Sequence, residues 1–242
     1  MSVQLITDKK TAKTLAAEYC PIIWQELEAA QDFITPVLLG DIRPDGLSAT
    51  ILRYLRTPTL YYRVMQDSKY TYLLFMVYHP FDWSDCAIPI VNKLDSHRHD
   101  TETILLRVAK PGNWGLKKRR MDACCVFHKS FKFKRNSSGD FFIEAQGHGI
   151  SPMSSDYVNA DRNIIRYSHF DLVNFENIPQ DTLLGWKDEF NKQGVNFPDQ
   201  QYDSFMRRHF WRSKRDDLRH DIGDIWSRPD RVFHCAEKVN RV

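Results

Sequence analysis

Short apolar runs separated by turn residues fill the chain between residues 49 and 175. They are rich in β-branched and aromatic residues, a composition typical of strands. The runs are ATILRYLR from residue 49, TLYYRVMQ from 59, YTYLLFMVYH from 70, TILLRVAK from 103, ACCVFHKSFKFK from 123, DFFIEAQG from 140 and HFDLVNF from 169. TPT and DSK separate the first three, which predicts adjacent antiparallel strands, and NSSGD at 136–140 predicts a hairpin turn. Seven or so short strands without long helices between them predict a mainly β protein, a β-sandwich.

Both ends of the chain show a helical pattern instead. Residues 7–30 are predicted to be helical, with a cap at Thr7 or Asp8 and a break or kink at Pro21, and residues 32–48 are predicted to be a loop. Beyond Pro179, helices are predicted at 181–192 and 200–220. The tail from Gly223 is too apolar for a disordered segment, so we expect it to pack back on the protein. The chain is therefore predicted to be one domain, 1–242. Its parts are an N-terminal helical extension (1–48), a β-sandwich core (49–178) and a helical basic C-terminal extension (179–242).

The entrance to one predicted strand carries an unusual set of polar residues. If TILLRV is extended, Ile104, Leu106 and Val108 share one face, and the same face continues backward to Glu102 and Asp100. Two carboxylates in a core-facing row are costly unless a basic partner, shared protons or a cation neutralises them. An Arg98-centred cluster of salt bridges is one way to do so, and a bound metal ion is another.

A divalent cation accounts for these residues together. His97 lies three residues before Asp100 and can fold over the same point, which gives two carboxylates and one imidazole. A shell of this kind favours magnesium, calcium or manganese over zinc. Asp82, or else Asp85, in the segment YHPFDWSD is the predicted fourth ligand.

A second candidate site lies in EAQGHGISP, residues 144–152. His148 stands between two glycines at the end of a predicted strand, and glycines let a backbone turn sharply near a ligand. This histidine could transfer protons or orient a metal ligand. The alternative is an exposed histidine in a turn.

The distribution of charge indicates a third candidate site, a surface that binds anions. The chain carries a net charge of +3, but residues 205–242 hold ten Lys and Arg against six Asp and Glu. A second basic run is Lys117, Lys118, Arg119 and Arg120. Such patches attract phosphates or nucleic acid, although a solvated face is the alternative. The candidate anion- or nucleic-acid-binding residues are these four with Arg207, Arg208, Arg212, Lys214 and Arg215, with Phe210, Trp211 and Trp226 available for stacking.

Other sequence features narrow the possibilities. The five cysteines include no CxxC pair, which argues against a zinc ribbon and a dense disulfide framework. No apolar stretch is long enough for a transmembrane helix, and the N-terminus lacks a signal-peptide pattern, so we expect a cytoplasmic protein. The sequence contains neither GxSxG nor a phosphate-binding GxxxxGK[ST] motif, so two common enzyme classes lack support. It does not indicate an oligomeric state.

The heptapeptide Ser96-His97-Arg98-His99-Asp100-Thr101-Glu102 resembles the signature Gly-His-Arg-His-Asp-Trp-Glu of the necrosis- and ethylene-inducing peptide-like proteins. YHPFDW before it and GHG after it extend the resemblance over roughly residues 55–175. The wider pattern is also similar to proteins related to a yeast vacuolar-sorting protein. Ser96 and Thr101 depart from the signature, as do the helical ends, the basic C-terminal region and the lack of a signal pattern, so secretion and plant toxicity are not expected.

The resemblance implies a β-sandwich with a divalent cation at one edge. His97, Asp100 and Glu102 match the family's metal ligands, Asp82 (or Asp85) matches a further aspartate, and His148 matches a histidine near the pocket. Secreted members of the family are cytolysins that bind plant sphingolipid head groups through this pocket, and they are not established enzymes.

Three functions follow from these features. The first is a metal-binding protein that recognises a polar ligand such as a glycan, a head group or a phosphate. The second is a metal-dependent phosphodiester or ester hydrolase, with His99 or His148 as acid or base. The third is nucleic-acid binding through the basic residues.

Overall fold

The computed structural model of the chain describes residues 2–29, 32–37, 58–82, 97–112, 118–127, 131–135, 139–158, 162–178 and 229–239. Several predictions fall outside these ranges: the run from residue 49, the helices at 181–192 and 200–220, Asp85, Lys117 and the basic residues Arg207, Arg208, Arg212, Lys214 and Arg215. For Asp82, His97 and His99 the structure describes the backbone alone.

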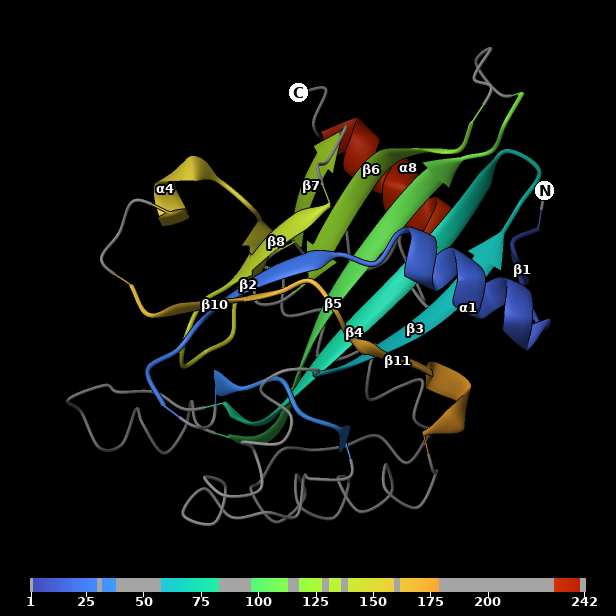
Figure 1. Cartoon of the computed structure of the whole chain (residues 1–242). Helices are drawn as coiled ribbons and strands as arrows, with labels where there is room; N and C mark the ends of the chain where they lie inside the picture. Colours follow the sequence, from blue (N-terminus) through green and yellow to red (C-terminus); the bar gives the residue numbers. More distant parts are fainter. Residues whose placement is uncertain are drawn as a thin grey trace.

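Two β-sheets form the described part of the protein, which confirms the predicted mainly β sandwich (Figure 1). The larger sheet contains β1 (Gln4–Leu5), β3 (Thr59–Gln66), β4 (Tyr70–Asp82), β5 (His97–Ala109), β6 (Arg120–Phe127) and β7 (Phe131–Arg135) in that spatial order. A further strand, β11 (Asp171–Asn174), pairs with β3 in parallel. The smaller sheet has the order β10 (Ile164–Tyr167), β2 (Ile22–Glu26), β8 (Asp140–Ile143) and β9 (Ile150–Pro152).

The main core lies between the sheets because each strand directs alternate residues toward the other sheet. On β5 these residues include Ile104, Leu106 and Val108, as their spacing predicted. They belong to one cluster of buried side chains with Ile23 of β2 and Phe141 of β8. The helix α1 (Lys9–Glu18) extends this core with Ala12, Leu15 and Ala16. Asp8 caps α1, since its Oδ2 accepts a hydrogen bond from the Thr11 amide at 2.8 Å.

The opposite face of the larger sheet is covered by the C-terminal helix α8 (Pro229–Val239). Val232 and Phe233 of this helix are buried with Tyr72, Leu74 and Leu105. This agrees with the expectation that the apolar tail packs back on the protein. Arg107 of β5 holds α8 against the sheet. Its guanidinium forms ion pairs with Asp122 of β6 and Glu237 of α8, and it lies 4.8 Å from the centre of the Phe233 ring. Two short helices, α4 (Ser155–Val158) and the 3-10 helix η5 (Phe175–Asn177), complete the described elements.

Three local predictions are wrong. Residues 22–26 form strand β2 instead of continuing the helix, because Ile22, Ile23 and Trp24 favour a strand and pair with both β8 and β10. The N-terminal segment is thus part of the sandwich. NSSGD does not close a hairpin, since β7 pairs with β6 in the larger sheet whereas β8 lies in the smaller one. The run at 123–134 is not one strand. It contributes to two antiparallel strands, β6 and β7, in which Phe127 pairs with Phe131.

The described helices are all too short or too polar to cross a lipid bilayer.

We predict that Phe233→Ala destabilises the protein by about 3–5 kcal/mol, because it leaves a cavity where a buried ring packs against Tyr72 and Arg107. Urea unfolding followed by circular dichroism measures this change. His234→Ala alters the exposed neighbouring residue and should cost less than about 0.5 kcal/mol. Equal effects of the two substitutions would show that α8 contributes little to the stability of the sheet.

Candidate metal and ligand site

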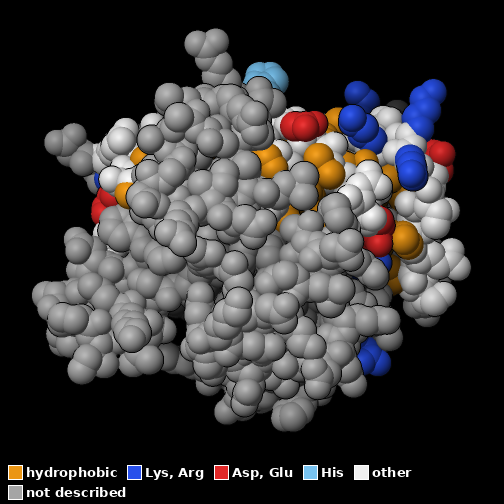
Figure 2. All heavy atoms as spheres, turned by 90° about the horizontal axis from the view of Figure 1, so that it is seen from below, with side chains coloured by type: hydrophobic (Ala, Val, Ile, Leu, Met, Phe, Trp, Pro, Cys, Tyr) orange, Lys and Arg blue, Asp and Glu red, His pale blue; other side chains and the backbone are white. Residues whose placement is uncertain are grey.

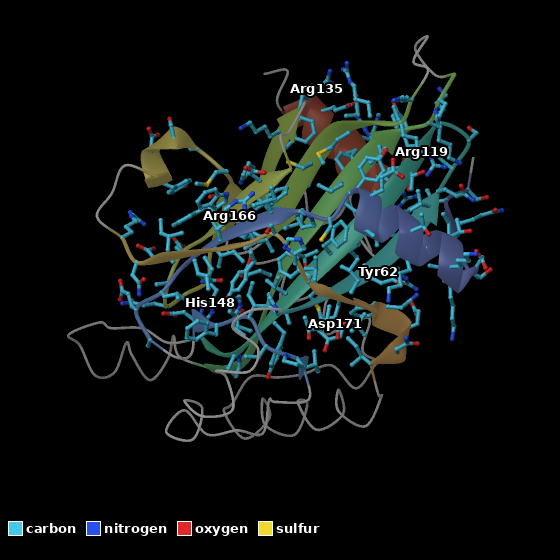
Figure 3. The ribbon with its side chains drawn as sticks, in the orientation of Figure 1. Tyr62, Arg119, Arg135, His148, Arg166 and Asp171 are labelled. Atoms are coloured by element: carbon cyan, nitrogen blue, oxygen red, sulfur yellow. The ribbon has the colours of Figure 1, made fainter. Side chains whose placement is uncertain are left out.

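Four chain segments converge at one end of the sandwich. His79 on β4 and Asp100 on β5 are cross-strand partners in the larger sheet. His148 lies in the loop between β8 and β9, and Asp32 belongs to the short segment 32–37 that follows β2. All four side chains are buried, although each is polar or charged. We call these residues the histidine–carboxylate cluster (the position of His148 is labelled in Figure 3).

His148 is the centre of this cluster because both of its ring nitrogens face a carboxylate. Nδ1 lies 3.0 Å from Oδ2 of Asp100, and Nε2 lies 3.2 Å from Oδ1 of Asp32. A carboxylate accepts hydrogen bonds, so this geometry suits an imidazolium that donates from both nitrogens. The ring therefore bridges the larger sheet and the segment after β2.

Asp32 is held in place by the backbone around it. Its Oδ2 accepts hydrogen bonds from the amides of Glu28 and Ala29, both at 2.7 Å. Its Oδ1 accepts from the amide of Gln146 at 2.8 Å and also faces His148. One buried carboxylate thus fixes two loops against each other, which explains why it stays in the interior.

His79 completes the cluster from the other side. Its ring is stacked on that of His148 with 3.8 Å between ring centres and 8° between ring planes. Its Nε2 lies 3.2 Å from Oε1 of Gln25, a buried residue of β2. Because the amide oxygen only accepts, Nε2 of His79 carries the proton in this contact. Gln25 therefore orients the ring from the smaller sheet.

The loop that carries His148 has a special backbone. Gln146 and His148 adopt positive φ angles of 66° and 48°, a region uncommon for residues other than glycine. The two residues with positive φ are thus neighbours of Gly147, which the sequence singled out as part of a sharp turn. A Cβ at Gly149 would lie 2.0 Å from the carboxylate of Glu144, an exposed and flexible side chain that would have to move aside. Strained backbone that surrounding contacts hold in place is typical of functional sites.

The cluster changes the pKa values of its members. Burial alone lowers the pKa of His148, but the hydrogen bonds and charges of Asp100 and Asp32 outweigh it and raise this pKa from 6.5 to about 9. Burial alone raises the pKa of Asp32. Its hydrogen bonds with His148 and with three backbone amides outweigh burial and hold the pKa well below 3.8. At neutral pH the cluster is therefore an imidazolium between carboxylates.

The same side chains form a possible metal-binding group. One ligand atom from each of His79, Asp100 and His148 fits within 4.8 Å of the others. Glu102, buried to 1% exposure, lies two residues further along the same face of β5. Two imidazoles and a carboxylate are a donor set that divalent first-row metals accept, so the residues fit such an ion.

The structure brings some of the predicted site residues together. Asp100 and His148 are in contact, and Asp100 and Glu102 are buried on the predicted face of β5. The backbones of Asp82 and His97 are cross-strand partners three residues beyond the pair His79–Asp100. That places them about 10 Å further toward the strand ends. The roles of His97, Glu102 and Asp82 as ligands, and of His99 and His148 as acid or base, stay predictions.

Three residues of the site were missed in the sequence. His79 stands in the segment YHPFDWSD, in which the fourth ligand was predicted at Asp82 or Asp85 because both follow a predicted strand. Antiparallel pairing of the runs from residues 70 and 103 through a long connection would have placed His79 beside Asp100. Asp32 and Gln25 carried no local signal, because the first lay in a predicted loop and the second in a predicted helix.

The described members of the basic run lie far from this cluster. Arg120 begins β6 and pairs with Ala109 at the end of β5, Lys118 and Arg119 directly precede it, and Asp100 is near the opposite end of β5. Figure 3 shows Arg119 far from His148. These three basic residues therefore take no part in the histidine–carboxylate cluster.

The fold and site define a two-sheet β-sandwich with a buried histidine–carboxylate cluster at one end. No protein-family model and no curated protein sequence matches the chain. Solved structures similar to it include "NLPPya in complex with glucosamine" (14% identity, TM-score 0.47) and "NLPPya in complex with mannosamine" (14%, 0.46). Each match covers 81% of this chain and 95% of the other.

A further similar structure is Necrosis and Ethylene inducing Protein 2 from the causal agent of cocoa's Witches Broom disease. It shows 16% identity and a TM-score of 0.35, and the match covers 64% of this chain and 68% of that one. Its name is that of the family that the heptapeptide resembles. Since identities of 13–16% concern the fold alone, the function of the site rests on the geometry of this chain.

We predict that the metal-free protein loses stability as the pH rises from about 6.5 to 9. A histidine with a raised pKa stabilises the folded state fully below its unfolded pKa, and this contribution disappears as the folded pKa is passed. The loss is about 3 kcal/mol at most. Urea unfolding with a chelator across this pH range measures it. His148→Gln should flatten the slope, and the exposed His169→Gln should not. If the stability of His148→Gln still falls over this pH range, the pH dependence comes from other groups.

Proposed function

We propose that the protein binds a divalent cation at the histidine–carboxylate cluster and recognises a polar ligand through it. The observation that carries the proposal is the convergence of His79, Asp100 and His148, whose ligand atoms fit within 4.8 Å of one another. Elements of both sheets contribute to the cluster, so the folded sandwich positions it in advance. Such preorganisation lowers the cost of binding.

Buried charge supports a cation at this position. Asp32 and Asp100 flank a single imidazolium, and Glu102 is buried nearby on β5. Buried carboxylates are costly unless positive charge balances them. A divalent ion would place positive charge beside these carboxylates, and His148 would release a proton to become a ligand, because only the neutral imidazole coordinates metal.

The donor set bears on which ion binds. Carboxylate oxygens favour magnesium, calcium or manganese, as predicted for Asp100 and Glu102, whereas imidazoles suit zinc and other transition metals. The cluster combines both kinds of donor, and manganese accepts both. We therefore propose manganese as the first ion to test, with zinc, magnesium and calcium beside it.

The ligand class follows from the coordination number. Three or four protein donors leave positions for water or for oxygens of a ligand on an ion of six-fold coordination. Hydroxyl and phosphate oxygens fill such positions, so we propose a glycan, a head group or a phosphate. Hydrolysis of phosphodiesters or esters at the same metal stays a second prediction from the sequence, and turnover distinguishes it from binding.

We predict that Asp100→Asn weakens manganese binding at least about 100-fold, more than the loss of an outer-shell contact costs. The substitution keeps the shape of the side chain and removes its charge. Isothermal titration calorimetry of metal-free protein measures the affinity, with circular dichroism to check folding. Asp156→Asn, on the exposed surface of α4, is the matched control and should bind as the unmodified protein does.

The same protein is then titrated with glucosamine, phosphorylcholine and inorganic phosphate, with and without manganese. Ligand binding that needs both the metal and Asp100 supports the proposal. Turnover of bis(p-nitrophenyl) phosphate or p-nitrophenyl acetate that is lost in Asp100→Asn would favour the hydrolase. Absence of metal binding in the folded protein, with all four ions tested, would contradict the metal site itself.

A further inference from the structure

Both imidazoles of the histidine–carboxylate cluster are held at the same ring nitrogen by one stretch of the chain. Nε2 of His79 lies 3.2 Å from Oε1 of Gln25, which is in β2. Nε2 of His148 lies 3.2 Å from Oδ1 of Asp32, which follows β2. All four side chains are fully buried. Residues 25–32 therefore contact both rings from the side of the smaller sheet.

The orientation of the Gln25 amide determines which nitrogen of His79 carries a proton. Nε2 of Gln25 donates a hydrogen bond to the carbonyl of Glu26 at 3.0 Å. This bond fixes the amide, so that its oxygen faces His79. An amide oxygen only accepts, and Nε2 of His79 must therefore donate. In the neutral ring, which is the form that coordinates metal, the lone pair is then on Nδ1.

Asp32 acts in the same way on His148 and is held more firmly. Its Oδ2 accepts hydrogen bonds from the amides of Glu28 and Ala29, and its Oδ1 accepts from the amide of Gln146. These bonds keep the carboxylate beside Nε2 of His148. Its oxygens already serve as hydrogen-bond acceptors, which suits a partner of the ring better than a ligand of an ion.

The group of possible metal ligands lies at the other nitrogen of His148. Nδ1 of this ring is 3.0 Å from Oδ2 of Asp100, and His79 is the cross-strand partner of Asp100. One ligand atom from each of these three residues fits within 4.8 Å of the others. Asp32 and Asp100 thus face different nitrogens of one ring, the first as an outer partner and the second as a candidate ligand.

The burial of Asp32 separates it from ordinary charged residues. Figure 2 shows Lys, Arg, Asp and Glu side chains at the protein surface, where water stabilises their charge. Asp32 is fully buried, so hydrogen-bond donors of the protein must do this instead. A buried carboxylate that accepts from one nitrogen of an imidazole is the usual outer partner of a metal-binding histidine.

We propose that Gln25 and Asp32 are positioning residues that make Nδ1 the metal-binding nitrogen of both imidazoles. The inference rests on the proposed metal site and adds a consequence for the choice of ion. Imidazoles suit manganese and zinc, whereas magnesium prefers oxygen ligands. Two imidazoles held in the correct orientation therefore raise the affinity for manganese more than the affinity for magnesium.

Isothermal titration calorimetry of the metal-free protein with manganese and with magnesium tests the proposal. Asp32→Asn removes the carboxylate, and Gln25→Leu removes the acceptor without a change of charge. We expect each variant to bind manganese about 10- to 100-fold more weakly, the usual effect of losing an outer partner. Magnesium binding, which depends on oxygen ligands, should fall less, so that the ratio of the two affinities falls about ten-fold.

Matched controls carry the same substitutions at exposed positions. Asp156→Asn on α4 and Gln4→Leu on β1 should leave both affinities unchanged. Circular dichroism verifies that each variant is folded. If Asp32→Asn does not fold, the ratio measured for Gln25→Leu decides the question.

Nuclear magnetic resonance of the zinc-loaded protein provides a second measurement. Long-range proton–nitrogen correlation spectra show which ring nitrogen of a histidine binds the ion and which one keeps its proton. We expect Nδ1 of His79 and of His148 to bind zinc and Nε2 of both to remain protonated. Coordination through Nε2 in the unmodified protein would overturn the proposal.

The calorimetry separates this inference from the metal site itself. Equal losses for both ions in Asp32→Asn and Gln25→Leu would show that these residues only stabilise the fold. Unchanged affinities would show that they do not act on the ion. Either result overturns the inference and leaves the metal site intact, provided that Asp100→Asn still weakens binding. If the unmodified protein binds no ion, the proposed function fails and this inference fails with it.

Discussion

The bridge from Asp32 through His148 to Asp100 is the constraint on which this end of the protein depends. It joins a segment that follows β2, the loop between β8 and β9, and strand β5 of the larger sheet. Among the described residues the His79–Gln25 hydrogen bond also joins the two sheets, and the core between the sheets is otherwise mainly apolar packing, which has no preferred direction. Hydrogen bonds from a single charged ring fix the relative position of three segments that packing alone would leave loosely specified.

Such a bridge is a costly way to stabilise a sandwich. Apolar residues of similar volume often stabilise a folded protein as much as a buried ion pair does, or more. Here the chain also accepts two positive φ angles and a stacked pair of imidazoles at the same place. Strain and buried charge that coincide are typical of a site kept for function. These features support the proposal that the cluster is a binding centre.

The sequence predicts the parts of this site that follow from the period of a strand. Alternation alone placed Asp100 and Glu102 on the buried face of β5, and the glycines around His148 indicated a sharp turn at a strand end. Alternation could not place His79 or Asp32 in the site. The position of His79 depends on the register between β4 and β5, and that of Asp32 on a long-range hydrogen bond from the Gln146 amide. Strand β2 was mistaken for a helix for a related reason, because its partners β8 and β10 are distant in sequence.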